Sequence, residues 1–108
     1  MLFRSESAIS KGLETFGAID FLVNNASGFL NGWNLAEIPL EDIDQEINVT
    51  YRAAVYMTRA ILGHFEKKND GTIVNIASGA GLTNRTVGEY PLYAADKGAI
   101  IQIGRAHV

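Results

Sequence analysis

The sequence predicts an α/β fold, a partial doubly wound sheet with the element order helix, strand, helix, strand, helix. Two short apolar runs, residues 19–25 and 72–77, have the length and composition of buried strands. Apolar residues at helical spacing occupy the segments before, between and after these runs. A helix that connects two such strands makes them parallel neighbours, with their carboxyl ends at one edge of the sheet. We therefore expect two adjacent parallel strands with a ligand-binding edge.

The first half of the chain opens with a predicted helix at residues 5–16. Its apolar residues include Ile9 and Leu13, which are four positions apart and share a helical face, and Gly17 ends the helix. The apolar run from 19 to 25 follows this turn directly, and we interpret it as a buried strand.

A long helix is expected from Pro39 to about Lys67. Proline suits the first helical position, and the acidic residues that follow it are favoured at the positive end of the helix dipole. The turn Asn69-Asp70-Gly71 leads from this helix into the next strand. The apolar positions recur at helical spacing and are Ile43, Ile47, Ala54, Met57, Ile61 and Phe65.

The second strand is expected at residues 72–77. This run is apolar apart from Asn75, which is typical of a parallel strand covered on both faces. A loop is expected from Ser78 to about Pro91, followed by a helix over residues 92–108. Pro91 is compatible with a helix start that holds Tyr93 at the edge of the sheet.

Composition excludes several classes of function. The chain has 108 residues, of which 47% are hydrophobic and 19% charged, as in ordinary globular domains. No stretch is apolar enough for a membrane span or a signal peptide, so we expect a cytoplasmic protein. The absence of cysteine excludes disulfides and thiolate chemistry, and the isolated His64 and His107 argue against a metal centre. A net charge of -3 without a basic cluster argues against nucleic acid as a partner.

The spacing of Tyr93 and Lys97 suggests acid–base chemistry. Residues four apart on a helix share one face, so the ammonium can lie close to the phenol. A fixed positive charge favours the phenolate and brings proton exchange at neutral pH within reach. Ser78 follows the second strand and is expected to share the sheet edge with Asn25. Taken alone, this pair also fits a half-buried tyrosine beside a solvated lysine.

Four segments in order resemble the short-chain dehydrogenase/reductase family. They are residues 19–28, 46–50, 71–81 and 93–97, which read IDFLVNNASG, EINVT, GTIVNIASGAG and YAADK. The resemblance covers nearly the whole chain and implies that residues 1–108 form a partial NAD(P)-binding, Rossmann-like domain. The catalytic set that it implies is Asn48, Ser78, Tyr93 and Lys97. The implied cofactor-binding residues are Asn24, Asn25 and Ala26, together with Tyr93 and Lys97.

The resemblance implies hydride transfer between NAD or NADP and a small carbonyl or alcohol substrate. Tyr93 would donate the proton, Ser78 would orient the substrate oxygen, Lys97 would acidify the tyrosine and bind the nicotinamide ribose, and Asn48 would complete a proton relay. Two positions depart from the family pattern. Ser27 replaces a glycine, and Asp96 places a carboxylate where the family usually has a small residue.

The family's glycine-rich first turn and its C-terminal substrate region have no counterpart here, so we expect the central part of a longer enzyme with little activity by itself. The resemblance also implies a homo-oligomer formed through the helices at 39–67 and 92–108. Two alternatives stay open: a non-enzymatic module that self-associates through those helices, and an unrelated α/β binding domain with accidental motifs.

Overall fold

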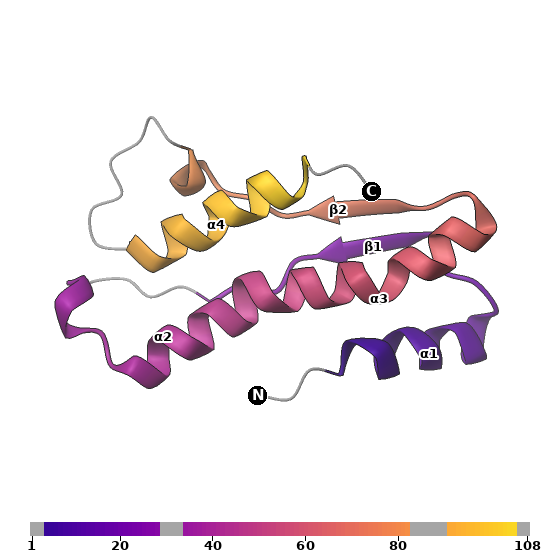
Figure 1. Ribbon diagram of the computed structural model, residues 1–108, viewed down its shortest axis with the longest axis horizontal. Coiled ribbons are helices and arrows are strands. Elements are labelled where there is room, and N and C mark those ends of the chain that lie inside the picture. The colour runs from indigo at the N-terminus through magenta and orange to yellow at the C-terminus, as the bar shows by residue number, and fades with distance from the viewer. Residues whose placement is uncertain (1–3, 29–33, 83–90, 106–108) are drawn as a thin grey trace.

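The computed structural model describes residues 4–28, 34–82 and 91–105. It confirms the α/β class, because helices alternate with two parallel strands that form one sheet (Figure 1). The elements in chain order are α1 (Ser5–Phe16), β1 (Phe21–Asn24), the 3₁₀-helix η1 (Leu35–Glu37), α2 (Leu40–Ile47), the π-helix η2 (Asn48–Arg52), α3 (Ala53–Lys68), β2 (Thr72–Asn75), the 3₁₀-helix η3 (Gly79–Gly81) and α4 (Pro91–Ile103).

The two strands pair in parallel and in register. Phe21 lies opposite Thr72 at the start of the ladder, and Asn24 lies opposite Asn75 at its end. Both strands therefore finish at the same edge of the sheet, as expected of a strand–helix–strand unit. Each strand is shorter than its predicted run.

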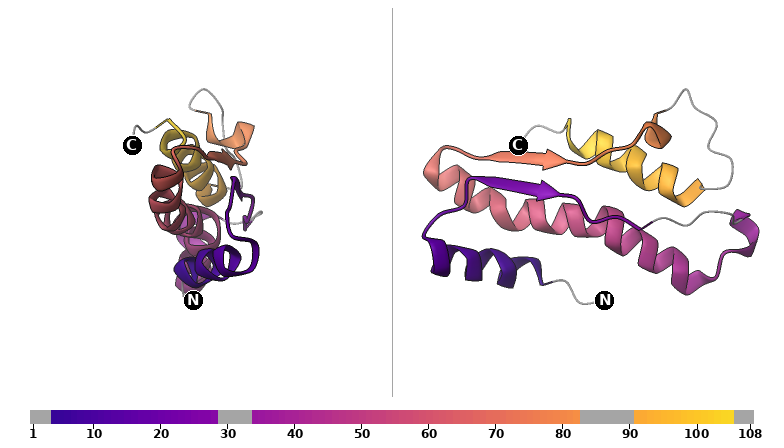
Figure 2. Two further views of the ribbon diagram at one scale, coloured as in Figure 1. Left: turned by 90° about the vertical axis from the view of Figure 1, so that its right-hand side faces the viewer. Right: turned by 180° about the vertical axis from the view of Figure 1, so that it is seen from behind.

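Within the described residues, helices cover the sheet on one face only. Helices α3 and α4 lie on the same side of the two strands (Figure 2). Side chains alternate between the faces of a strand. Leu22 points into the core and is 8% exposed, whereas its neighbours Phe21 and Val23 are 69% and 55% exposed. Val74 on β2, the partner of Val23, is 42% exposed. The strands therefore carry apolar residues on both faces, but the described helices bury only one of these faces.

The core lies between α1, α3 and the covered face of the sheet. Its buried residues are Ile9, Leu22, Ile61 and Phe65, and Ile61 is fully buried. The end of α3 is fastened to the start of β1, because the ammonium of Lys68 pairs with the Asp20 carboxylate and donates to the carbonyl oxygen of Ile19 at 3.0 Å.

Shortening Ile61 to alanine is expected to lower the free energy of unfolding by about 2–5 kcal/mol, because the side chain is fully enclosed and its removal leaves a cavity. Ile76→Ala is the matched control, since Ile76 is 41% exposed and its truncation opens no enclosed space. Urea denaturation followed by circular dichroism measures both. Equal losses from the two variants would contradict this placement of the core.

The predicted long helix is interrupted, which corrects the expectation of one continuous α-helix over 39–67. Residues 48–52 form a π-helical turn, in which the backbone N–H of Ala53 donates to the carbonyl oxygen of Asn48, five residues earlier. Such turns insert an extra residue into a helix and occur frequently at functional sites. Hydrophobic periodicity missed it because the apolar positions on both sides still fit a helical pattern.

Two helix ends also differ from expectation. Pro39 caps α2 instead of occupying its first turn, with ψ of 139°, and its carbonyl oxygen accepts from the N–H of Ile43 at 3.1 Å. Helix α4 ends at Ile103, and a turn at residues 104–105 follows. Gly104 is a poor helix former and accounts for this end. Residues 83–90 of the predicted loop and 106–108 of the predicted last helix, including His107, lie outside the described residues.

Candidate active site

Tyr93 and Lys97 lie together on α4, as their spacing predicts. The Lys97 ammonium nitrogen is 5.8 Å from the centroid of the Tyr93 ring. Lys97 is only 3% exposed, and its ammonium donates a 2.7 Å hydrogen bond to the carbonyl oxygen of Ile76, just beyond β2. The lysine is therefore held between the tyrosine ring and the end of the second strand, and the reading of a solvated lysine does not hold.

Ser78 is brought to α4 by a close approach of two backbones. Its hydroxyl oxygen accepts from the N–H of Ala80 at 3.2 Å and so caps η3. A Cβ atom on Gly81 would lie 2.6 Å from both the nitrogen of Gly98 and the carbonyl carbon of Lys97. Only glycine permits this distance, so the segment that carries Ser78 packs directly against the helix that carries Lys97.

Asn48 stands at the first position of the π-helical turn η2. Its side chain lines a cavity of about 220 Å³ together with Asp44, Ile47 and Arg52. The structure thus places Asn48 where the helix geometry changes, and η2 contacts α4.

The predicted cofactor-binding residues Asn24, Asn25 and Ala26 form part of the lining of one small cavity of about 120 Å³ at the end of β1. The rest of the lining is apolar and consists of Leu22, Val23, Val49, Ala53, Ala54 and Met57. Asn24 is also a structural residue, because its amide nitrogen donates to the Asn75 side-chain oxygen at 2.8 Å and to the Thr58 hydroxyl at 3.2 Å. The motif match did not reveal this second role. The partner, Asn75, was recognisable only as the one polar residue in an apolar strand.

A buried polar cluster behind the site was not anticipated. Glu46 of α2, Thr50 of η2 and Asp96 of α4 are 4%, 1% and 6% exposed. The Thr50 hydroxyl donates to the Glu46 carboxylate at 3.3 Å and accepts from the N–H of Gly28 at 2.9 Å. Sequence reasoning had noticed Asp96 only as a departure from the family pattern. Glu46 was recognised only as the first residue of the family segment 46–50, and its burial was not, because it follows several other acidic residues in an apparently amphipathic helix.

Burial changes the ionisation of both acids. Desolvation, and then the repulsion from Glu46, raise the pKa of Asp96 to about 7, against the attraction of Lys97. Desolvation also raises the pKa of Glu46, which the hydrogen bond from Thr50 and the charge of Lys97 oppose. Asp96 does not neutralise its neighbour Lys97 through a direct ion pair, because the hydrogen bond of the Lys97 ammonium goes to the carbonyl oxygen of Ile76.

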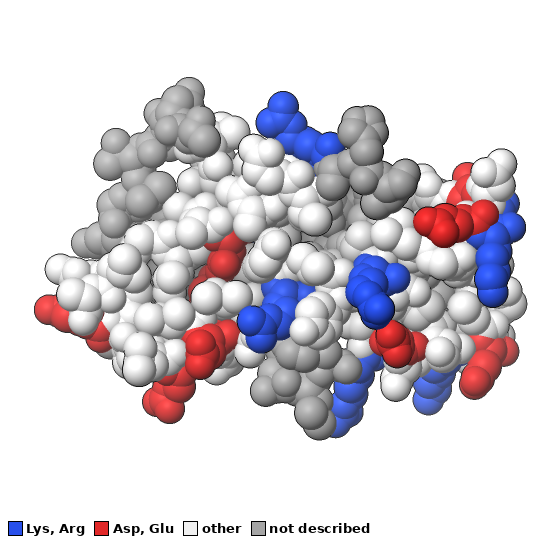
Figure 3. Space-filling view, in the orientation of Figure 1, with Lys and Arg blue, Asp and Glu red and all other residues white. Residues whose placement is uncertain are grey.

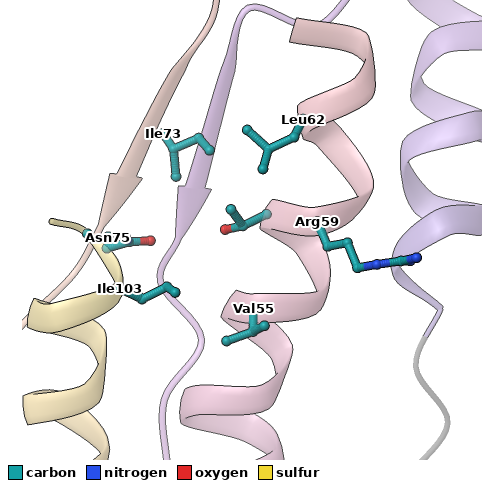
Figure 4. Close-up of a pocket in the computed structure, with 8 residues that line it drawn as sticks. Val55, Arg59, Leu62, Ile73, Asn75 and Ile103 are labelled. Carbon is teal, nitrogen blue, oxygen red and sulfur yellow. The ribbon is translucent and has the colours of Figure 1, made fainter. Parts of the chain in front are cut away.

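A further cavity of about 310 Å³ lies between α3, β2 and the end of α4 (Figure 4). Its walls are largely apolar, with Val55, Leu62 and Ile73 pointing inward. The guanidinium of Arg59 turns away from it toward α1, where it pairs with Glu6 at 3.4 Å. None of the predicted site residues lines this cavity, so it is separate from the candidate active site.

The helix-bearing face of the molecule carries charges of both signs. Acidic side chains gather over α2, and basic ones lie over α3 (Figure 3). The described residues contain no cluster of three or more side chains suited to a metal ion. Within the same residues, no helix combines the length and the apolar character needed to cross a membrane.

Comparison with protein families matches residues 4–107 to the short chain dehydrogenase family. The chain is 37% identical over 105 residues to the 2-(R)-hydroxypropyl-CoM dehydrogenase of Xanthobacter autotrophicus, covering 93% of this chain and 40% of that protein. It is 31% identical over 102 residues to an uncharacterized oxidoreductase of Thermotoga maritima, covering 94% and 39%. Among solved structures, ElxO with NADP bound superposes with a TM-score of 0.82 at 32% identity, covering 92% of this chain and 39% of ElxO.

The chain therefore belongs to the short-chain dehydrogenase family, which confirms the resemblance found in its motifs. It spans about 40% of the length of the curated relatives that it matches. Because the chain belongs to an oxidoreductase family and has a matching fold, we exclude the alternative that it is an unrelated α/β domain with accidental motifs.

Proposed function

We propose that this chain supplies the proton-transfer portion of an NAD(P)-dependent oxidoreductase that interconverts a small carbonyl compound and an alcohol. The observation that carries the proposal is the position of Lys97, a buried cation held beside the Tyr93 ring and bonded to the strand end that leads to Ser78. A lysine this deeply buried is rare away from functional sites.

Tyr93 is the proton donor in the direction of reduction. Negative charge develops on the carbonyl oxygen as the carbon is reduced, and a phenol already directed at that oxygen stabilises the charge and then transfers its proton. Ser78 supplies a second hydroxyl donor to the same oxygen and so fixes its position. In the oxidative direction the Tyr93 oxygen takes the proton back.

Lys97 and Asn48 support that transfer. The ammonium of Lys97 supplies a positive charge beside the Tyr93 ring, 5.8 Å from its centroid. Its hydrogen bond to Ile76 holds it in place without cancelling its charge, because a carbonyl oxygen is neutral. Asn48, at the π-helical turn, is proposed to position a water molecule through which the lysine exchanges protons with solvent.

The described residues fit one part of a dinucleotide. The cavity lined by Asn24, Asn25 and Ala26 is about 120 Å³, below the roughly 300–1,000 Å³ of sites that enclose a drug-sized ligand. These residues would hold the cofactor near its reactive end, with the hydroxyl of Tyr93 and the ammonium of Lys97 as hydrogen-bond donors. When bound, NAD(P) supplies the hydride acceptor or donor. ElxO, the structural neighbour with NADP bound, supports this assignment.

Titration of the complete product of the gene that encodes this sequence with NADH and NADPH, followed by nucleotide fluorescence, tests the proposal. We expect saturable binding, weakened about tenfold or more by Lys97→Met, because a charge-assisted hydrogen bond contributes about 1.5–3 kcal/mol. Lys67→Met is the matched control, since Lys67 is exposed at the end of α3. Circular dichroism confirms that both variants fold. Binding that Lys97→Met leaves unchanged would contradict the assigned role.

Self-association is the second candidate function. It is supported by the uncovered face of the sheet, where Phe21, Val23, Val74 and Ile76 are between 41% and 69% exposed. Contiguous apolar surface of this kind favours contact with another protein surface. The helices α2, α3 and α4 also remain candidates for the interface of a homo-oligomer. In the described part of the chain, however, their exposed large apolar residues are limited to Leu40 and Tyr56. Flat nucleotide titrations together with concentration-dependent dimerisation would favour this function.

A further inference from the structure

We propose that Asp96 is a positioning residue that seats α4 against α2 as the neutral acid, so that its ionisation displaces the helix that carries Tyr93 and Lys97. This proposal concerns the packing of the site and does not depend on the proposed reaction. It begins from an unusual placement, because Asp96 lies one residue before Lys97 on α4 and is 94% buried, with 6% of its surface exposed.

The surroundings of Asp96 do not suit a carboxylate anion. Its Oδ2 atom is buried and has no hydrogen-bond partner within the described residues. An ionised carboxylate needs several donors when it leaves water, whereas a neutral acid tolerates burial at far lower cost. Lys97 does not donate to this Oδ2 atom, and the hydrogen bond of its ammonium goes to the carbonyl oxygen of Ile76, 2.7 Å away.

A second buried carboxyl group, on the neighbouring helix α2, opposes the ionisation of Asp96 and is firmly held. Glu46 of α2 is 4% exposed, and the Thr50 hydroxyl, itself bonded to the N–H of Gly28, anchors its Oε1 atom. Gly28 closes the other side, since a Cβ there would lie 2.1 Å from the Glu46 Oε2 atom. Two buried acids on packed helices disfavour double ionisation, which raises the pKa of Asp96.

The charged groups around Asp96 decide whether its pKa is raised or lowered. The elements packed on α4 are α2, η2 and η3. Glu46 of α2 opposes ionisation of Asp96, and Lys97 favours it. The other titratable side chains on these elements are Glu41, Asp42 and Asp44 of α2 and Tyr51 and Arg52 of η2. The groups that shift the pKa of Asp96 are Glu46 and Lys97, with desolvation as the largest cause.

Linkage gives the expected pH dependence. The pKa of Asp96 is raised in the folded chain from an ordinary 3.8 to about 7, so the folded form holds one more proton than the unfolded form between those values. Stability from this group is therefore complete below pH 4 and is lost as the pH rises toward 7. One proton corresponds to at most about a tenfold change in the folding equilibrium constant per pH unit.

Two NMR titrations on the 108-residue chain test the proposal, using ¹³C labels on the aspartate carboxyls and on the tyrosine ring carbon that bears the hydroxyl. We expect the Asp96 carboxyl to titrate well above the usual aspartate range and the Tyr93 signal, assigned through Tyr93→Phe, to shift with the same midpoint. In Asp96→Asn, the Tyr93 signal should stay, at every pH of the titration, where it lies in the parent chain when Asp96 is protonated. Asp70→Asn, which changes an exposed carboxyl, should leave the behaviour of the parent chain intact.

Glu46→Gln provides an independent variant if Asp96→Asn folds poorly. Removing the opposing charge is expected to lower the Asp96 midpoint, and the Tyr93 midpoint should follow it. An Asp96 carboxyl that titrates near 3.8 would overturn the proposal, and so would a Tyr93 signal that stays still while Asp96 ionises. Neither readout requires bound nucleotide, so failure here is distinguishable from failure of the proposed reaction.

Discussion

Replacing Tyr93 with phenylalanine is expected to lower the rate of carbonyl reduction by about 10²–10⁴-fold, the usual contribution of a positioned general acid. The ring remains, so its contact with the Lys97 ammonium at 5.8 Å and the packing of α4 are retained. The loss should therefore appear in kcat, with a small change in nucleotide affinity. Steady-state kinetics on the complete product of the gene that encodes this sequence measures both quantities.

The control for this experiment is Tyr56→Phe. Tyr56 is 41% exposed on α3, away from Lys97 and Ser78 in the chain, so the same chemical change there should leave kcat within about twofold of the parent. A Tyr93→Phe enzyme that keeps most of its kcat would show that another group supplies the proton. A fall in affinity without a fall in kcat would reassign Tyr93 to binding alone.

Adding one methyl group at Gly81 is expected to have the second large effect. In Gly81→Ala the new Cβ would lie 2.6 Å from the nitrogen of Gly98 and the carbonyl carbon of Lys97. Backbone atoms cannot rotate away as side chains can, so η3 must separate from α4 and carry Ser78 with it. Overpacking of this kind costs about 1–3 kcal/mol of stability. A displacement of about 1 Å at a catalytic group can cost about 10²-fold in rate.

Gly98→Ala is the matched control, because it adds the same methyl group on the facing helix. Its Cβ would be 3.5 Å from the carbonyl oxygen of Gly81, which is ordinary contact, and alanine in a helix interior is favoured over glycine by about 1 kcal/mol. We expect this variant to retain activity and to unfold at equal or higher urea concentration. If both variants behaved alike, the close approach at Gly81 would not be what positions Ser78.

The fold followed from the sequence wherever a local pattern was sufficient. The period of the apolar residues predicted the helices and strands, and their order predicted parallel pairing, which the register of Phe21 with Thr72 confirms. Local periodicity missed the π-helical turn that starts at Asn48, because one inserted residue leaves the flanking patterns unchanged. Only the structure shows which face of the sheet the described helices cover, because an apolar strand carries no information about the elements that pack on it.

For the candidate site too, the sequence predicted the features that depend on local spacing. Tyr93 and Lys97 share a helical turn, so their spacing alone indicated that they would lie together. The roles of Asn48, Ser78, Asn24, Asn25 and Ala26 came from family motifs and stay predictions at the level of single residues. The burial of Glu46 against Asp96 was beyond reach, because in the sequence one acid belongs to an acidic helix start and the other to a separate helix.

By itself, the sequence determined the order of the elements, the parallel pairing and the family, since each depends on spacing within short segments or on motifs in order. Only the tertiary structure decided where the Lys97 ammonium points, which acid is buried and which glycine must lack a side chain. The bond from Lys97 to Ile76 joins positions 21 residues apart, and the repulsion between Asp96 and Glu46 acts between two helices. Such contacts arise when separate segments pack and desolvate one another, and no local pattern of residues encodes that burial.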